Sequence, residues 1–385
     1  MKLYEKSNKL KYETKDSVNK VHQQIKYKVD QYFAVKNFSR HGNSALWFKT
    51  LSLFILLGLT YYGLIHSHSF HTLLFSFIVF GFIFLLLGIN IGHDAAHNCV
   101  TGNKRIDNIL FQLIFGLQGF NGYMWRIKHN FSHHIFPNVY NNDTDLEISK
   151  LILLSPSQKK LAIHKYQYLY APFLYMFYSL GWIFYMDFIV LFAKRHANIK
   201  MGKIPPVEIM KLVLIKIAYI FIFIVLPAIL TQLPFLYVLS AYILMNFLVS
   251  LFVAFTFFIS HHVLETEYTE TKDETVVSDS WIQHQIESTI DFSTNSIIGN
   301  YIFGGFNLHI AHHIFPNVSH IHYPEITKLI KQTLKENHLT WYKSFSFMDG
   351  VISHFSLLKK NGSGIFENEE KMVYDKPTSN TTLVL

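Results

Sequence analysis

Four apolar stretches dominate this chain of 385 residues, and each is long enough to cross a lipid bilayer. About 20 apolar residues form a helix that spans the hydrocarbon core. The stretches cover residues 47–65, 70–91, 212–231 and 234–259. Charged residues make up only 16% of the chain, whereas soluble domains carry roughly 25%. The sequence therefore predicts an all-α integral membrane protein, multi-pass, with two transmembrane helical hairpins.

A fifth apolar stretch, residues 168–192, is rich in Tyr and is interrupted by Asp187. Aromatic rings with a polar tip suit the headgroup region, so we expect an interfacial or re-entrant helix. Two complete hairpins then leave the N-terminus, residues 92–167 and residues 260–385 on one side of the membrane. Lys and Arg concentrate in the first 40 residues and in 194–216, which is typical of cytoplasmic segments.

Three regions follow from this pattern. We expect a basic cytoplasmic N-terminal arm at 1–43, a membrane domain with a cytoplasmic helical cap at 44–360, and a disordered C-terminal tail at 361–385. The net charge of +8 is explained by the segments that flank the spans, so no nucleic-acid partner is expected. Cys99 is the only cysteine, which excludes an intramolecular disulfide and a thiolate metal cluster.

Eight of the 22 histidines fall into three compact motifs within the two cytoplasmic regions. The motifs are HDAAH (His93, His97), HNFSHH (His129, His133, His134) and HIAHH (His309, His312, His313). Side chains three or four residues apart share one helix face, so each motif should point its imidazoles towards one locus. Imidazole is a common metal ligand, and so many rings are costly to bury without a cation. These spacings predict a metal centre.

The number of ligands points to two ions, because one transition ion takes at most about six. Additional ligands are expected from His261 or His262 at the end of the last span, or from His284. We favour His261 and His284, with ordinary polar roles as the alternative. A further trio, His66, His68 and His71, lies in the turn on the far side of the membrane, where it cannot join this centre.

The heptapeptide HHIFPNV occurs twice, at 133–139 and at 312–318. Proline ends a helix because it lacks a donor and clashes with the preceding turn. Each copy is thus expected to deliver two adjacent ligands from a helix end and then to turn the chain away. The alternative is a duplication without functional pressure, which the different flanking sequences disfavour.

The three histidine boxes, with the first two in one loop and the third after a second hairpin, resemble those of the membrane fatty acid desaturases. The resemblance covers about residues 45–345. The stretches GGFNLHIAHHIFPNVSHIHYPEI and YQYLYAPFLY are similar to the bacterial linoleoyl-CoA-desaturase-like branch, which is related to front-end desaturases. His309 departs from the Gln that usually opens the third box of front-end enzymes. No HPGG haem motif of a fused cytochrome b5 domain occurs in 1–43.

The resemblance implies an enzyme that introduces a cis double bond into a fatty acyl chain, carried as acyl-CoA or acyl-lipid. It implies two iron ions, molecular oxygen as co-substrate, and a separate electron donor such as ferredoxin or cytochrome b5 with its reductase. The family's ligands fall on the eight box histidines and near His261 and His284. A bacterial inner membrane, with the site facing the cytoplasm, is the expected location. Zinc lacks redox activity, which favours iron.

Carboxylates close to the boxes are expected to hold the imidazole tautomers. The candidates are Asp94, Asp145, Glu147, Glu265 and Glu287. Each is equally well explained as a solvated surface charge.

Two other functions remain open from the residues alone. Hydroxylases, ketolases and alkane monooxygenases use similar boxes to insert oxygen, and box spacing does not separate them from desaturases. A membrane metal store or transporter is disfavoured, because transporters place ionisable residues within their spans.

Overall fold

The structure is a computed structural model that describes residues 4–6, 10–13, 16–147, 149–269, 271–272, 276–277 and 280–363. The C-terminal tail predicted from residue 361 falls mostly in 364–385, which lies outside the described residues.

Four helical rods have the length and apolar character of membrane spans, as the sequence predicted. They cover Ser44–Ile65, Phe70–Ala96, Pro206–Thr231 and Phe235–His261. The first rod is α2 (Ser44–Ile65) and the last is α12 (Phe235–His261). The second rod consists of α3 (Phe70–Leu87), η1 (Gly88–Gly92) and α4 (His93–Ala96); the third consists of α10 (Pro206–Ile220), η6 (Phe221–Val225) and α11 (Leu226–Thr231).

Side-chain caps fix where the first hairpin begins and turns. Asn43 accepts hydrogen bonds from the backbone N–H groups of Ala45 and Leu46 at the start of α2. Ser69 and Thr72 form a reciprocal capping box at the start of α3. Such caps satisfy N–H groups that have no partner within the helix.

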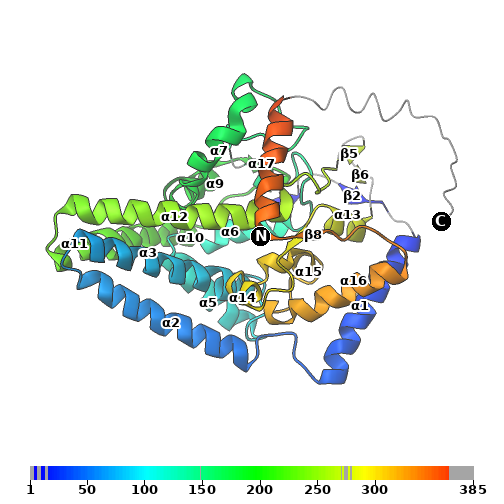
Figure 1. The fold of residues 1–385 in the computed structure, drawn as a ribbon, viewed down its shortest axis with the longest axis horizontal. Helices are drawn as coiled ribbons and strands as arrows, with labels where there is room; N and C mark the ends of the chain where they lie inside the picture. Colours follow the sequence, from blue (N-terminus) through cyan, green and yellow to red (C-terminus); the bar gives the residue numbers. More distant parts are fainter. Residues whose placement is uncertain are drawn as a thin grey trace.

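The two hairpins place both of their turns at one end of the molecule, opposite α1, α15 and α16 (Figure 1).

The fifth apolar stretch forms a helix pair that is bent by 75° between Tyr175 and Tyr178. The pair contains η4 (Ala162–Tyr166), α7 (Gln167–Tyr175), α8 (Tyr178–Gly181), η5 (Trp182–Met186) and α9 (Asp187–Phe192). Asp187 is buried and pairs with Lys216 of α10 at 2.7 Å. The bend agrees with the expected interfacial or re-entrant segment.

A helical cap covers the end of the bundle that carries the histidine motifs. Its helices are α1 (Asp16–Lys36), α5 (Lys104–Leu117), α6 (Gly122–Lys128), α13 (Trp281–Glu287), α14 (Ile297–Ile302), α15 (His309–Ile314), α16 (Tyr323–Glu336) and α17 (Phe347–Ser363). Shorter turns are η2 (His129–His133), η3 (Thr144–Glu147), η7 (Phe306–Leu308) and η8 (His320–His322).

The basic N-terminal arm contributes to this cap. Val21, Ile25, Val29 and Phe33 of α1 are buried and recur every fourth residue. Residues at this spacing form one face of a helix. The face packs in one core with buried residues of α16, namely Ile326, Ile330 and Leu334.

Short strands tie distant segments together. β1 (Tyr4–Lys6) pairs antiparallel with β4 (Ile199–Met201), which also pairs with β3 (Arg195–His196). β6 (Val276–Val277) pairs parallel with β2 (Lys11–Tyr12) and antiparallel with β5 (Thr271–Lys272). β7 (Asp291–Phe292) pairs parallel with β8 (Ser344–Phe345). All three sheets belong to the loops and the cap, not to the spans.

Replacing His66, His68 and His71 together by Ala should leave activity and bound metal unchanged. The trio lies at the hairpin turn, and a bilayer core of about 30 Å separates that turn from the box histidines. Within the described part of the chain, His66 contacts its own helix, because its Nδ1 lies 2.9 Å from the Tyr62 carbonyl oxygen. The check is product and metal analysis of the triple variant; loss of metal would contradict the two-hairpin topology.

Candidate metal centre

The first box lies where the second span ends. A wide turn, η1, precedes His93, and His97 forms the C-cap of α4. Gly92 allows this turn to approach α5, because a Cβ there would lie 2.9 Å from the Ile114 side chain. The span therefore delivers both imidazoles into the cap rather than into lipid.

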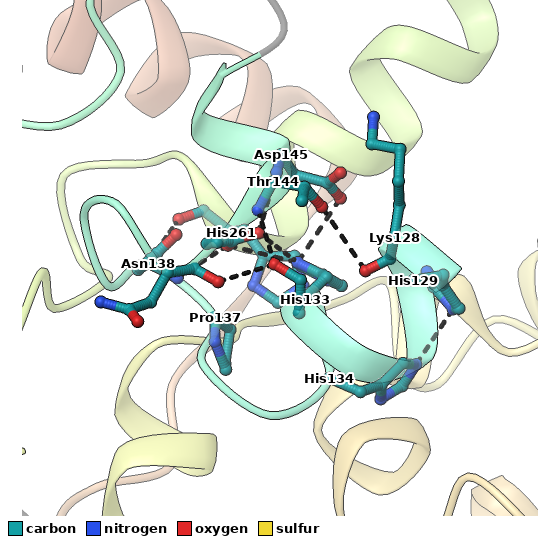
Figure 2. A network of polar contacts seen from close by, with 12 residues as sticks. Lys128, His129, His133, His134, Pro137, Asn138, Thr144, Asp145 and His261 are labelled. Carbon is teal, nitrogen blue, oxygen red and sulfur yellow. Dashed lines mark hydrogen bonds and ion pairs between the residues drawn. The ribbon is translucent and has the colours of Figure 1, made fainter. Parts of the chain in front are cut away.

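The second box forms a turn of π-helix, η2, in which the His134 N–H donates to the His129 carbonyl at 3.0 Å. An i to i+5 turn is wider than an α-helical one, and such turns are frequent at functional sites. His129 and His134 consequently face each other, with their Nε2 atoms 3.0 Å apart. Figure 2 shows this pair on one side of the turn and His133 on the other.

The third box forms the short helix α15, which follows two glycines in left-handed conformation. Gly304 has φ of +57°, and a Cβ there would lie 2.6 Å from the Ile89 carbonyl oxygen. Gly305 has φ of +89°. Only glycine adopts this backbone without strain, and here it lets α15 approach the end of the second span.

The histidines gather into two buried clusters of four, within each of which the possible ligand atoms lie within 4.8 Å of one another. The first tetrad consists of His93, His97, His129 and His312; the second tetrad consists of His133, His261, His309 and His313. The second and third boxes each contribute to both tetrads. The expectation that each box points to a single locus was therefore too simple, because the wide turn η2 separates His133 from His129 and His134.

His134 adjoins the first tetrad. Its Nε2 lies 3.0 Å from Nε2 of His129 and 2.9 Å from Nε2 of His312. Metal–imidazole bonds of about 2.1 Å place neighbouring ligands at right angles roughly 3 Å apart. His93 Nε2 lies 3.2 Å from His129 Nε2, close to the same separation. The spacing of these nitrogens fits a shared metal ion.

The protonation state of the rings also suits a metal. Burial lowers the pKa of most of these imidazoles well below the usual value, so they are neutral at pH 7; they include His97, His129, His134, His309, His312 and His313. Neutral imidazole is the ligating form. Several buried ring nitrogens also have no hydrogen-bond partner among the described residues, including His97 Nε2, His261 Nε2 and His313 Nε2. The residues present fit a metal centre.

Protein oxygens contact the Nδ1 atoms of several histidine rings and so orient these rings. His133 Nδ1 lies 3.2 and 3.3 Å from the two carboxylate oxygens of Asp143. The corresponding Nδ1 atoms face the Ser288 carbonyl for His261, the Tyr323 hydroxyl for His312 and the Gln285 side-chain oxygen for His313, at 3.0, 3.1 and 2.9 Å. The carboxylate, carbonyl and side-chain amide oxygens can only accept, so they keep the proton on Nδ1 and leave Nε2 for a metal.

Asp143 is the functional carboxylate that the sequence did not single out. It is fully buried and also accepts backbone hydrogen bonds from Asn138 and Asp145 at 2.9 Å each. Burial lowers the pKa of His133, but the charges of Asp143 and Asp145 outweigh burial and raise that pKa to about 9. The only signal in the sequence was the motif NNDTD, shortly after the second box.

The predicted carboxylates occupy different places. Asp145 reaches His133 Nδ1 at 3.4 Å, as expected of an orienting group. Asp94 instead accepts from Ser319 and His320, and so links the first box to the segment after the third box. The others contact residues outside the tetrads: Glu147 with Ala197, Glu265 with Ser353 and Glu287 with Gln283.

The two additional ligand candidates differ in position. His261 ends α12 and belongs to the second tetrad. His284 lies outside both tetrads, with Nε2 2.8 Å from the Pro137 carbonyl and Nδ1 3.1 Å from the Thr269 hydroxyl. His262, the third candidate, has Nδ1 3.2 Å from the Tyr268 hydroxyl.

Both copies of HHIFPNV connect the tetrads. His133 and His134 lie at the second and first sites, while His312 and His313 lie at the first and second. Helix α15 ends at Ile314, two residues before Pro316, as the proline predicts. The buried Phe136 and Phe315 follow each histidine pair. The repeat thus gives each copy one ligand position at each site.

Three cavities lie at this centre or next to it. The histidine cavity is lined by residues of both tetrads and by Lys128, Trp125 and Phe306. An inner cavity continues between the spans past Phe84, Met245 and Val249. An outer cavity lies along the bent helix pair beside Phe177 and Tyr185. Tyr178 and Trp182 line all three cavities. These shared lining residues place the three cavities next to one another, beside the histidines.

Four candidate membrane spans, and buried histidine clusters that could hold metal ions beside apolar cavities, fit a membrane enzyme that acts on apolar molecules. The sequence model of the fatty acid desaturase family matches residues 67–345, most of the chain. The chain therefore belongs to the fatty acid desaturase family. It is an oxidoreductase that introduces a double bond into a fatty acyl chain, as the family resemblance implied.

Curated relatives cover most of the chain as well. An sn-1 linoleoyl-lipid 6-desaturase of Synechocystis is 28% identical over 342 residues, 88% of this chain and 94% of the relative. An acyl-lipid (8-3)-desaturase of Physcomitrium patens is 30% identical over 343 residues, 88% of this chain and 71% of the relative. Acyl-lipid (8-3)-desaturase B of Dictyostelium discoideum is 25% identical and covers 88% and 75%.

Proposed function

We propose that this enzyme desaturates an acyl chain of a membrane lipid at a di-iron centre held by the two tetrads and His134. The observation that carries the proposal is the pair of buried imidazole clusters beside an apolar cavity between the spans. Five imidazoles would hold one ion and four the other. We place His284 outside this ligand set, because both of its ring nitrogens face protein oxygens.

Iron is the metal that fits this reaction. When bound, it would supply the redox chemistry with dioxygen that removal of hydrogen from an unactivated methylene requires. In the overall reaction two hydrogens leave adjacent carbons, and dioxygen with two electrons and two protons becomes two waters. A separate protein, ferredoxin or cytochrome b5 with its reductase, supplies the electrons.

The protein's own residues orient the imidazole rings, exclude water and position the substrate. Asp143 and Gln285 hold the rings of His133 and His313 in one tautomer, and the Tyr323 hydroxyl orients the ring of His312. Buried aromatic residues around the histidine cavity, including Phe306 and Phe258, exclude water from the centre. The inner cavity orients the methyl end of the acyl chain between the spans.

The acyl carrier and the location complete the proposal. Relatives named as acyl-lipid desaturases favour a glycerolipid ester over acyl-CoA. The basic arm and the 194–216 segment favour a cytoplasmic cap, and a bacterial inner membrane suits the branch that the sequence resembles.

Expression in a host that lacks polyunsaturated fatty acids tests this function directly. We expect gas chromatography–mass spectrometry to find a new cis double bond in the lipid acyl chains when linoleate is supplied. Oxygenated products in place of a new double bond would indicate a hydroxylase, and unchanged lipids would contradict the proposal.

A further inference from the structure

Lys128 is a buried lysine whose ammonium group has no hydrogen-bond partner among the described residues. Only 2% of the residue is exposed, and Nζ lies 4.6 Å from the centre of the Trp182 ring. Figure 2 shows the side chain extending away from His134, with dashed contacts only at its backbone oxygen. An unpaired buried charge costs free energy, and one aromatic contact offsets only part of that cost.

Burial lowers the pKa of Lys128, and the negative charges of Asp145, Asp143 and Glu147 act against that shift. Asp145 lines the same cavity, and Asp143 and Glu147 lie on the adjoining segment. The other buried lysines near the spans have partners. Lys216 donates to Asp187 and to the Gly119 carbonyl at 2.7 and 2.6 Å, and Lys49 donates to the Tyr301 carbonyl at 2.5 Å. Lys128 thus differs from them in presenting a cation to a cavity.

The positions of the three cavities indicate which end of the acyl chain would lie between the spans. The outer cavity is bordered by Phe177 and Tyr185, which are 40% and 62% exposed on the bent helix pair. Aromatic rings of this kind lie at the level of lipid headgroups. The inner cavity runs between buried span residues and suits an apolar chain end. An acyl chain whose methyl end enters the inner cavity would place its carbonyl end near the histidine cavity, which Lys128 lines and which shares Tyr178, Trp182 and Phe258 with the outer cavity.

We propose that the Lys128 ammonium donates a hydrogen bond to the carbonyl oxygen of the acyl substrate and so sets which carbons face the tetrads. This inference rests on the proposed function. The acceptor is the same in a lipid ester and in an acyl-CoA thioester, and a charge-assisted bond of this kind is among the stronger ones. A cation at a fixed place beside the proposed metal ligands would set the number of carbons between the substrate carbonyl and the new double bond.

The test compares linoleoyl phosphatidylcholine, its linoleyl ether analogue without the carbonyl, and linoleoyl-CoA in proteoliposomes. For wild type we expect KM for the ether to exceed that for the ester by about tenfold, the effect of one charge-assisted hydrogen bond. Lys128→Met should raise KM for the ester to the ether value and give double bonds at more than one position. Lys128→Arg keeps a cation and should restore a single position.

Arg126→Met is the matched control, because it removes a positive charge two residues away that borders none of the three cavities. It should keep the ester preference and the single double-bond position. Activity on only the ester or only the thioester identifies the carrier, and the carbonyl contact is supported in either case if the ether is disfavoured.

Equal use of ester and ether by an active wild type would overturn the role of Lys128 and leave the proposed function intact. The same holds if Lys128→Met retains the ester preference and a single position. This comparison of substrates needs no variant, so it decides the matter even if Lys128→Met does not fold. A wild type that desaturates none of the substrates would overturn the proposed function and this inference together.

Discussion

Replacing His133 by Ala is expected to abolish desaturation while the protein remains in the membrane. His133 belongs to the second tetrad, and Asp143 holds its Nδ1. The variant removes an imidazole of the proposed ligand set and leaves the buried Asp143 carboxylate without its imidazole partner. Activity should fall by more than about 100-fold, which is the upper range for loss of a residue that only hydrogen-bonds to a metal ligand. His97→Ala and His312→Ala should behave alike, since both residues belong to the first tetrad.

The measurement is product analysis together with the amount of protein in the membrane fraction, because the spans supply the energy of insertion. His284→Gln is the matched control, a buried histidine outside both tetrads. It should retain its metal and cost about 1–3 kcal/mol of stability through the hydrogen bonds that it loses. Full activity in any of the three alanine variants would remove that residue from the site, and loss of metal in His284→Gln would return His284 to the ligand set.

Asp143→Asn should lower metal affinity or activity by about 10–100-fold, the usual effect of losing a carboxylate behind a ligating histidine. The substitution keeps the size of the side chain but removes the charge that faces His133 Nδ1. One oxygen of Asn can still accept from the Asn138 or Asp145 backbone, so the loop at 138–145 should remain folded.

Asp145→Asn serves as the comparison for this prediction. Its side chain is 35% exposed and lies 3.4 Å from His133 Nδ1, so its charge is more easily replaced by solvent. We expect a smaller loss of metal in a chelator titration monitored by metal analysis. An equal or larger effect of Asp145→Asn would show that Asp143 does not orient His133.

The spans and the three boxes were predictable because each rests on a local pattern. Apolar length identifies a span whatever its neighbours, and all four predicted spans are confirmed with bounds shifted by a few residues. The parity of two hairpins placed all three boxes on one side. The structure agrees, since His93, His129 and His312 meet in one tetrad.

The division of the box histidines between the two tetrads was not predictable from spacing. An α-helical reading places His129, His133 and His134 on one face, but η2 is a π-helical turn. A π-helical turn is wider than an α-helical one, and the sequence alone carries no clear signal for it.

The residues around the box histidines could not be assigned from the sequence for a similar reason. Asp143 and Asp145 are equivalent as sequence letters, and only the turn after Pro137 buries the first and half-exposes the second. His261 and His284 were equally good candidates by position along the chain. The structure distinguishes them because His261 ends a span that points into the centre, whereas His284 faces the Pro137 carbonyl.

The central claim is that the two tetrads, with His134, hold two metal ions that are iron in the active enzyme. Metal analysis of purified protein, with activity measured on the same sample, tests it most directly. We predict two irons per chain, with activity proportional to iron content across preparations and lost when zinc replaces iron, because zinc has no redox chemistry. An active sample with one metal ion per chain, or with none, would contradict the account.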